Sequence, residues 1–275
     1  MKIAVLSDVH GNVPALEAVL ADMETWRPDQ VIVNGDLINR GPHSLACLRS
    51  IRARFPHCRL LKGNHEAFVL AAAATPANPD DPLSELNRMA WWTCAQLGST
   101  IEEVKGWADH LDLTDLDGGS LHITHGSRRS NREGIHPEIT EEELAARLGD
   151  PRALFIAAHT HRPFMRRFNG NLVVNVGSVG QPFDGDARAS YGRFTFAKGG
   201  WRAELKRVAY DKPQAENDFV TSGFLEAAGP IGRLIHLELR QSRAHIAPWR
   251  RHYLDAVKSA ELTVAEAVDR YLASL

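Results

Sequence analysis

Short apolar runs alternate with helix-like stretches over the first 75 residues. Residues 3–6, 31–33 and 60–61 form apolar runs of the length and composition that buried strands have. Between the first two runs, Asn12 can cap a helix that carries Pro14 in its first turn. The alternation is the βαβ pattern of a sheet with parallel strands and covering helices.

Residues 75–111 interrupt this rhythm. Three prolines precede a stretch with a helical pattern at 86–97, and a second helical pattern follows at 101–111. We therefore expect a helical insertion over about residues 75–111, which could act as a lid. Within it, Trp91 and Trp92 are expected to pack inside the insertion and not to form a base-stacking platform.

Strand signals return after the insertion, and some of them come in pairs. The single runs lie at 121–124 and 154–158. The runs at 164–168 and 172–176 flank a turn centred on Gly170, which predicts a hairpin. The last two runs, at 191–196 and 201–208, are separated by Gly199 and Gly200 and predict a second hairpin.

Beyond about residue 210 the pattern becomes helical and ends in an amphipathic stretch. We expect one domain over residues 1–210 and a mainly helical appendage over residues 211–275. The whole chain has 275 residues, of which 44% are hydrophobic and 24% charged, so it can bury a substantial core.

Charge and cysteine content say more about partners and cellular location than about the reaction. The formal net charge is only -2, and no basic surface with interleaved aromatic residues marks a nucleic-acid partner. The arginines at 128, 129 and 132 are either solvated or able to grip a polyanionic substrate. Three scattered cysteines, no signal-peptide pattern and no apolar run of roughly 20 residues favour a cytoplasmic protein without a membrane partner. The oligomeric state stays open.

Polar clusters follow the predicted strands. Ligands of open α/β sheets bind beyond the carboxyl ends of the strands, so loops distant in sequence can converge on one site. Two carboxylates, one amide and four imidazoles can meet there: Asp8, His10, Asp36, Asn64, His125, His159 and His161.

This mixture of oxygen and nitrogen donors, without thiolate, suits first-row divalent ions. We expect Mn²⁺ first, with Fe²⁺, Zn²⁺, Ni²⁺ or Mg²⁺ as alternatives. Seven ligands are too many for one ion once water is included. Two ions that share a bridging carboxylate, about 3.5–4 Å apart, would account for all of them.

Charge counting then points to the substrate. Two divalent cations bring four positive charges and Asp8 and Asp36 return two negative ones, so the centre favours an anionic phosphate. The chain has neither a GxxxxGK[ST] loop nor a cysteine-dependent phosphatase motif, so hydroxide bridging the two cations is the expected in-line nucleophile. His65, beside Asn64, is the best-placed general acid for the leaving group.

Five motifs occur in order over roughly residues 3–180: DVHG, GDLINRG, GNHE, THG and HTH. Together they resemble the calcineurin-like metallophosphoesterase superfamily. GDLINRG and GNHE are similar to the phosphoprotein phosphatase and diadenosine tetraphosphatase branch, whereas NVGSVGQPFDGDARASYG resembles small bacterial phosphodiesterase-like members.

The resemblance implies a four-layer α/β/β/α sandwich with strands in both directions, in place of the simple βαβ sheet. It implies that Asp36 bridges two metals and that His65 is the catalytic acid, with Arg40 contacting the phosphate. The remaining ligands divide by position: Asp8, His10 and His161 on one metal, and Asn64, His125 and His159 on the other.

Two positions depart from the family pattern. Asn39 stands where the phosphoprotein phosphatases have an acidic residue that orients the catalytic histidine, and an amide cannot stabilise an imidazolium by charge. Ala158 replaces the usual glycine before His159, a small change that we expect to be tolerated. The first departure makes protein phosphatase activity less expected and leaves metal binding unaffected.

The favoured function is a hydrolase of phosphate mono- or diesters on a small molecule, a nucleotide or a phosphoprotein. Two alternatives stay open: a non-catalytic interaction protein that keeps the fold as a scaffold, and a nuclease. A scaffold would not need the complete set of ligands together with His65, and a nuclease would need a basic groove that the composition does not indicate.

Overall fold

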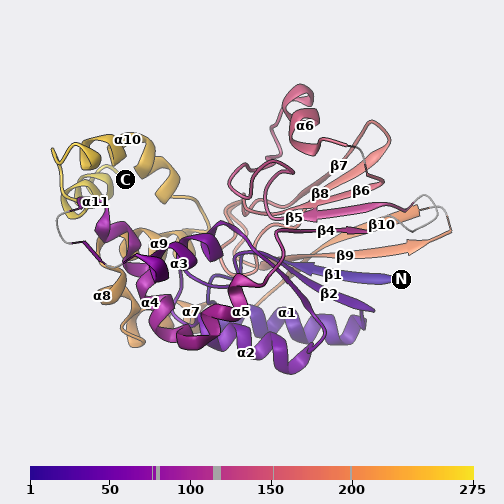
Figure 1. The fold of residues 1–275 in the computed structure, drawn as a ribbon, viewed down its shortest axis with the longest axis horizontal. Helices are drawn as coiled ribbons and strands as arrows, with labels where there is room; N and C mark the ends of the chain where they lie inside the picture. The colour runs from indigo at the N-terminus through magenta and orange to yellow at the C-terminus, as the bar shows by residue number, and fades with distance from the viewer. Residues whose placement is uncertain (76, 79–80, 114–118, 151, 199) are drawn as a thin grey trace.

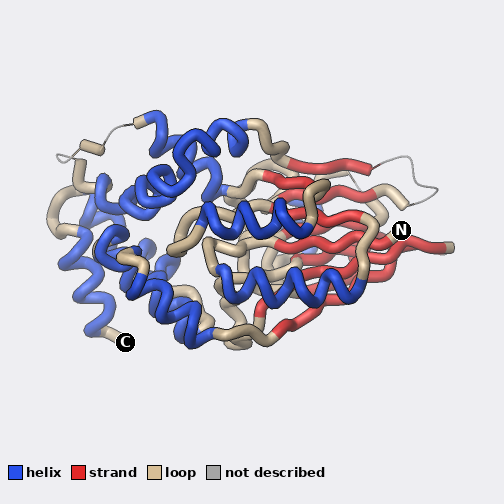
Figure 2. The backbone as a smooth tube through the Cα atoms, turned by 90° about the horizontal axis from the view of Figure 1, so that it is seen from below, coloured by secondary structure: helices blue, strands red, loops and turns tan. Residues whose placement is uncertain are grey.

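Two five-stranded sheets pack face to face, with helices on their outer faces (Figure 1). The computed structural model describes residues 1–275 apart from 76, 79–80, 114–118, 151 and 199. Seen from below, the two long helices α1 (Val13–Trp26) and α2 (Ser44–Arg54) run across one outer face (Figure 2). The layers confirm the expected α/β/β/α sandwich.

The first sheet has the order β10-β9-β1-β2-β3. Its strands β1 (Lys2–Leu6), β2 (Gln30–Asn34) and β3 (Arg59–Leu61) are parallel, with Ala4 opposite Val31. The hairpin of β9 (Ala189–Ala197) and β10 (Gly200–Val208) adds to β1 in the antiparallel direction. The sheet is therefore mixed, as the family resemblance implied.

The second sheet has the order β4-β5-β6-β8-β7. Strands β5 (Leu121–Thr124), β6 (Leu154–Ala157) and β8 (Asn171–Asn175) are parallel to one another. Strands β4 (His110–Leu113) and β7 (Phe164–Phe168) close its two edges in the antiparallel direction. Both predicted hairpins are confirmed, although residue 199 lies outside the described residues.

Alternating side chains of β1 hold the layers together. Ala4 and Leu6 pack against α1, whereas Ile3 and Val5 face the second sheet. On the far side, Phe155 of β6 packs against α6 (Glu141–Leu148). Because strands buried on both faces need continuous apolar sequence, the short apolar runs marked them correctly.

The insertion is only partly as expected. Its helical part comprises the 3₁₀ turn at Ser84–Asn87, α4 (Arg88–Leu97) and α5 (Ile101–Lys105), after α3 (Asn64–Ala74). The prediction of helix through residue 111 was wrong, because β4 begins at His110 and pairs with β5. Short-range pattern cannot reveal this pairing.

The C-terminal helices build a core of their own. Side chains of α4 pack into it, among them Trp92, whose ring meets Phe224 edge to face at 5.9 Å. Trp92 belongs to the insertion but packs against the C-terminal helices, whereas we expected it to pack inside the insertion. The helices are α7 (Lys212–Thr221), α8 (Phe224–Ala228), α9 (Pro230–Gln241), α10 (Ile246–Lys258) and α11 (Val264–Ala273).

Two further features concern the cysteines and the lengths of the helices. The thiols Cys47, Cys58 and Cys94 are all free. In the described part of the chain, every helix is too short or too polar to cross a bilayer.

Candidate metal centre

The carboxyl ends of the parallel strands bring seven predicted ligands to one edge of the sandwich. Asp8 follows β1, Asp36 follows β2, and Asn64 begins α3 just after β3. From the other sheet, His125 follows β5 and His159 follows β6. Each sheet therefore contributes ligands, and the site lies where the two sheets meet.

Asp8, His10 and His161 form the first group. Asp8 Oδ1 lies 3.1 Å from His161 Nε2 and 3.8 Å from His10 Nε2, and the two Nε2 atoms are 3.2 Å apart. Asp8 Oδ1 is buried and has no hydrogen-bond donor among the described residues. An orphaned carboxylate oxygen facing two imidazole nitrogens is the arrangement that a cation would satisfy.

Asp36, His125 and His159 form the second group. His125 Nε2 lies 3.2 Å from Asp36 Oδ2 and 3.1 Å from Asn64 Oδ1, which adds the predicted amide ligand. The His125 and His159 rings meet edge to face at 5.2 Å. The donor atoms of Asp36, His125 and His159 lie within 4.8 Å of one another.

The two groups adjoin through their carboxylates. Asp36 Oδ2 lies 3.9 Å from His10 Nε2, and Asp8 Oδ1 lies 3.9 Å from His125 Nε2. Each carboxylate thus reaches an imidazole of the other group. The donor atoms of His10, Asp36 and His65 also lie within 4.8 Å of one another, so Asp36 reaches imidazoles on both sides of the cluster.

Backbone carbonyls fix how two of the rings face the site. His125 Nδ1 lies 2.8 Å from the Asn34 carbonyl oxygen, and His161 Nδ1 lies 2.5 Å from that of Gln181. A carbonyl accepts only from an N–H, so Nδ1 of each ring carries a proton, and when the ring is neutral Nε2 offers its lone pair to the cluster.

The loops that carry the site are conformationally strained. Among the described residues, eleven non-glycine positions have positive φ angles, and seven of them belong to the site loops. Such angles cost on the order of 1–3 kcal/mol each unless the surroundings enforce them. The seven are Asp8, His10, Asp36, Asn39, Arg40, His159 and His161.

Glycines allow the loops to approach one another. A Cβ atom on Gly63 would lie 2.1 Å from Asp36 Oδ1, and one on Gly35 would lie 2.7 Å from His125 Nδ1. Both positions therefore require glycine for steric reasons.

The electrostatics of the protein without metal favour positive charge at the centre. Burial opposes ionisation of Asp36, yet the His125 and His65 imidazoles hold its pKa well below the usual range. Burial also opposes charging of His125, but Asp36 and Asp8 raise its pKa to about 10. A proton on His125 thus takes the place that a cation would fill, and a cation must displace it.

His65 lies at the start of α3, beside the ligands. Its ring meets His10 edge to face at 4.9 Å, and Asn39 Nδ2 lies 3.1 Å from its Nδ1. Burial lowers the pKa of His65 to about 3, although Asp36 pulls in the other direction. The ring is therefore neutral, and with Asn39 donating to Nδ1 its proton lies on Nε2.

Glu66 was quoted in the GNHE motif but was given no role, and it organises the site. Its buried carboxylate accepts from the backbone N–H groups of Asp36 and Gly63 at 2.8 and 2.7 Å, and from Leu37 at 2.9 Å. Because Glu66 is the third residue of α3, its bond to the Gly63 N–H also caps the start of that helix. The position of the acid in the motif was the available signal.

Arg40 lies near the cluster in a buried ion pair that the sequence did not reveal. Its Nε donates to Gln181 Oε1 at 2.6 Å, and its Nη2 donates to a carboxylate oxygen of Glu238 in α9. Its guanidinium lies 5.5 Å from the ring of Phe183, which stacks on His161 at 4.3 Å. Residue 238 is 198 positions away, so no local pattern could link it to Arg40.

The arginine-rich loop at 128–132 touches the surroundings of the site at one point. Arg132 lies 4.8 Å from the ring of Phe68, which meets His65 edge to face at 5.3 Å. Arg129 instead pairs with Glu133. Only Arg132 of these is directed toward residues next to the ligands.

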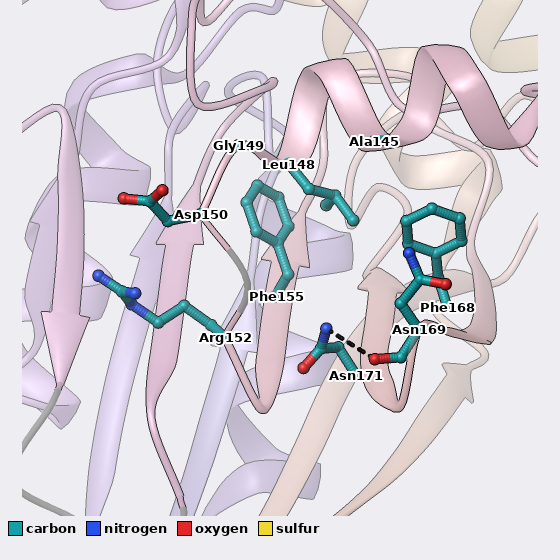
Figure 3. A pocket seen from close by; sticks show the side chains of 9 residues that line it. All are labelled: Ala145, Leu148, Gly149, Asp150, Arg152, Phe155, Phe168, Asn169 and Asn171. Atoms are coloured by element: carbon teal, nitrogen blue, oxygen red, sulfur yellow. Dashed lines mark hydrogen bonds between the residues drawn. The ribbon is translucent and has the colours of Figure 1, made fainter.

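A separate cavity lies between α6 and the second sheet (Figure 3). Leu148, Phe155 and Phe168 line it, and Asn171 Nδ2 donates to the Asn169 carbonyl oxygen at its rim. None of its lining residues belongs to the ligand cluster, which lies beyond the opposite ends of β6 and β8.

Comparison with known proteins finds a matching family and several relatives. Residues 1–199 match the family model described as the calcineurin-like phosphoesterase superfamily domain. An uncharacterized protein of Methanocaldococcus jannaschii is 29% identical over 249 residues, which cover 82% of this chain and 95% of that one. A symmetrical bis(5'-nucleosyl)-tetraphosphatase of Acidovorax ebreus is 30% identical over 178 residues, covering 62% of this chain and only 57% of the tetraphosphatase.

Solved structures show the same architecture. A metallophosphoesterase from Sphaerobacter thermophilus is 26% identical and superposes with a TM-score of 0.69, covering 88% of this chain and 99% of that one. A hypothetical protein from Pyrococcus horikoshii superposes with a TM-score of 0.73 at 18% identity, over 89% of this chain and 99% of that one. The second likeness concerns the fold alone.

Proposed function

The chain belongs to the calcineurin-like phosphoesterase superfamily and is a hydrolase acting on phosphate esters, and we propose that it works with two divalent cations held at the strand-end cluster. Asp8, His10 and His161 would hold one cation, and Asn64, His125 and His159 the other. Asp36 would bridge them. We propose Mn²⁺ as the first candidate metal because the ligands are oxygen and nitrogen atoms without thiolate.

One observation carries this proposal. Two groups of donors, all buried except the half-buried His159, adjoin through Asp8 and Asp36, and the centre they surround stabilises a proton on His125 in the absence of metal. A scaffold would not need ionised carboxylates and lone pairs aimed at one another in a buried space, because each such group costs stability.

Two bound cations would supply Lewis-acid charge and activate a water molecule against the phosphorus. The residues of the chain supply the rest. His65 presents its Nε2 proton to the leaving oxygen, and Asn39 keeps that proton on Nε2 by donating to Nδ1. Arg40 contacts the phosphate oxygens.

The proposed substrates are phosphate mono- or diesters of a small molecule, a nucleotide or a phosphoprotein. The tetraphosphatase relatives favour the nucleotide class, although this chain spans little more than half of their length. Asn39 disfavours phosphoproteins, because a neutral amide stands where the protein phosphatases have an acid.

The test is hydrolysis of p-nitrophenyl phosphate, bis-p-nitrophenyl phosphate and diadenosine tetraphosphate by protein stripped of metal and reloaded with Mn²⁺. Asn64→Ala and His65→Ala are the variants, and exposed His57→Gln is the matched control. Turnover that needs metal, falls in both variants and survives in the control supports the proposal. Turnover without metal, or no turnover with any metal, would leave the scaffold as the better account.

A further inference from the structure

The C-terminal helices send one carboxylate into the surroundings of the site. Glu238 of α9 is 1% exposed, and its Oε2 accepts from Arg40 Nη2. Arg40 is itself 9% exposed, so the pair is largely desolvated. Such a pair is costly to break, because removing one partner leaves an uncompensated buried charge.

The other oxygen of Glu238 anchors the carboxylate to the start of α10. Oε1 accepts from the backbone N–H groups of His245 and Ile246, at 2.7 and 2.8 Å, at the start of α10. These are donors that a helix N-terminus leaves without intrahelical partners. Glu238 is therefore anchored by α10 before it reaches Arg40, and its direction is set by the packing of α9 against α10.

The guanidinium keeps an open edge in this arrangement. Of its five N–H groups, Nε–H goes to Gln181 and one Nη2–H goes to Glu238. Within the described structure the other three have no hydrogen-bond partner. These three, which include both N–H groups of Nη1, can donate to phosphate oxygens.

One aromatic ring connects Arg40 to the ligand cluster. Phe183, below its guanidinium, is stacked on His161. Arg40 is therefore beside the ligand cluster, although its anchors belong to other parts of the chain.

We propose that Glu238 is a positioning residue for phosphate binding, which holds Arg40 so that the open edge of the guanidinium receives the substrate phosphate. The C-terminal helices then complete the active site and are more than an appendage to it. This inference rests on the proposed function and adds to it a residue beyond the 1–199 region that matches the family model.

Glu238→Gln is the decisive variant. The glutamine retains an oxygen that can accept from His245 and Ile246, but it places an amide with no charge opposite Arg40. We expect KM to rise and the inhibition constant of inorganic phosphate to weaken, each by about tenfold, with kcat within about twofold. The matched control is Asp269→Asn, which removes an exposed ion pair between α11 and Arg233 of the same helix α9. Its KM should not change.

A double-variant cycle separates positioning from a general effect on folding. If Glu238 acts through Arg40, adding Glu238→Gln to Arg40→Met should change KM by less than about twofold, because the guanidinium it positions is gone. The double variant also carries no unpaired arginine, so it remains measurable if Glu238→Gln alone folds poorly. Circular dichroism and metal content are measured for every variant.

The outcomes are distinct. An unchanged or lower KM in Glu238→Gln, or a further loss of several-fold in the Arg40→Met background, would overturn the positioning role while the wild-type turnover stands. Absence of metal-dependent turnover in the wild type would instead overturn the proposed function. In that case binding of inorganic phosphate by calorimetry still tests whether Glu238 and Arg40 act together.

Discussion

The strand-end edge and the C-terminal helices differ in the kind of side chain that they bury. The edge buries carboxylates and imidazoles on strained loops, with seven non-glycine residues at positive φ. The helices bury apolar side chains such as Phe219, Phe224 and Trp249. The first arrangement opposes stability and the second supplies it.

Chemistry and stability therefore reside in different parts of this chain. Polar groups at the edge are held apart from water in a geometry that folding alone would not favour. The apolar core of the helical region contributes stability that offsets part of this cost. The same region contributes a single carboxylate, Glu238, toward the site. Substitutions in the two regions should therefore separate activity from stability.

The largest effect on activity is expected at Asp36. Asp36→Asn keeps the shape of the side chain and removes its charge. Asp36 Oδ2 lies between the two ligand groups, 3.9 Å from His10 Nε2 and 3.2 Å from His125 Nε2. Metal-dependent turnover should fall to background, and bound metal should drop below two equivalents in metal analysis. The fold should survive, because a like-charge partner of Asp8 has been removed. Retained turnover would show that the chemistry does not depend on the Asp36 carboxylate.

His65→Gln should be the next in size. The side chain keeps a polar group but loses the proton donor beside the ligands, so kcat should fall by about 10²–10⁴-fold. Metal content should stay the same, because His65 is proposed as an acid and not as a ligand. A fall in metal content equal to the fall in kcat would instead assign His65 to the metal.

In the helical region, Phe224→Ala should act on stability. Phe224 is fully buried and meets both Trp92 and Phe219 edge to face. Its loss should lower the free energy of unfolding by about 3–5 kcal/mol in urea titrations. The kcat of the folded fraction should stay within about twofold. A loss of kcat at full folding would show that this core reaches the chemistry.

The smallest expected effect is the release of one proton when metal binds. His125 has a pKa raised from 6.5 to about 10 in the protein without metal, so it is charged at pH 8. A metal ligand must be neutral, and Mn²⁺ binding should therefore release about one proton, measured by calorimetry in buffers of different ionisation enthalpy.

The same shift gives the sign of the pH dependence. Because the folded pKa of His125 is raised, its stabilisation of the metal-free protein is fully present below about pH 6.5 and is lost as pH rises through about 10. Protein loaded with Mn²⁺ should not lose this stabilisation as the pH rises. Proton uptake on binding would contradict the assigned charge.

The sequence allowed the edge to be predicted far better than the helical region. Six of the seven ligands lie within three residues of an apolar run, so motif and strand together place Asp8, Asp36 and His125. The sheets were harder, since β4 was predicted as helix and its pairing with β5 is not local. Glu238 and Gln181 were missed because each meets Arg40 across at least 141 residues of chain.

The most direct test of the dinuclear account is a titration of metal-stripped protein with Mn²⁺, following turnover of a phosphate ester at each addition. If two cations are needed, turnover should be absent at the start and rise to a plateau at two equivalents per chain. A plateau at one equivalent, or full turnover before any metal is added, would contradict it.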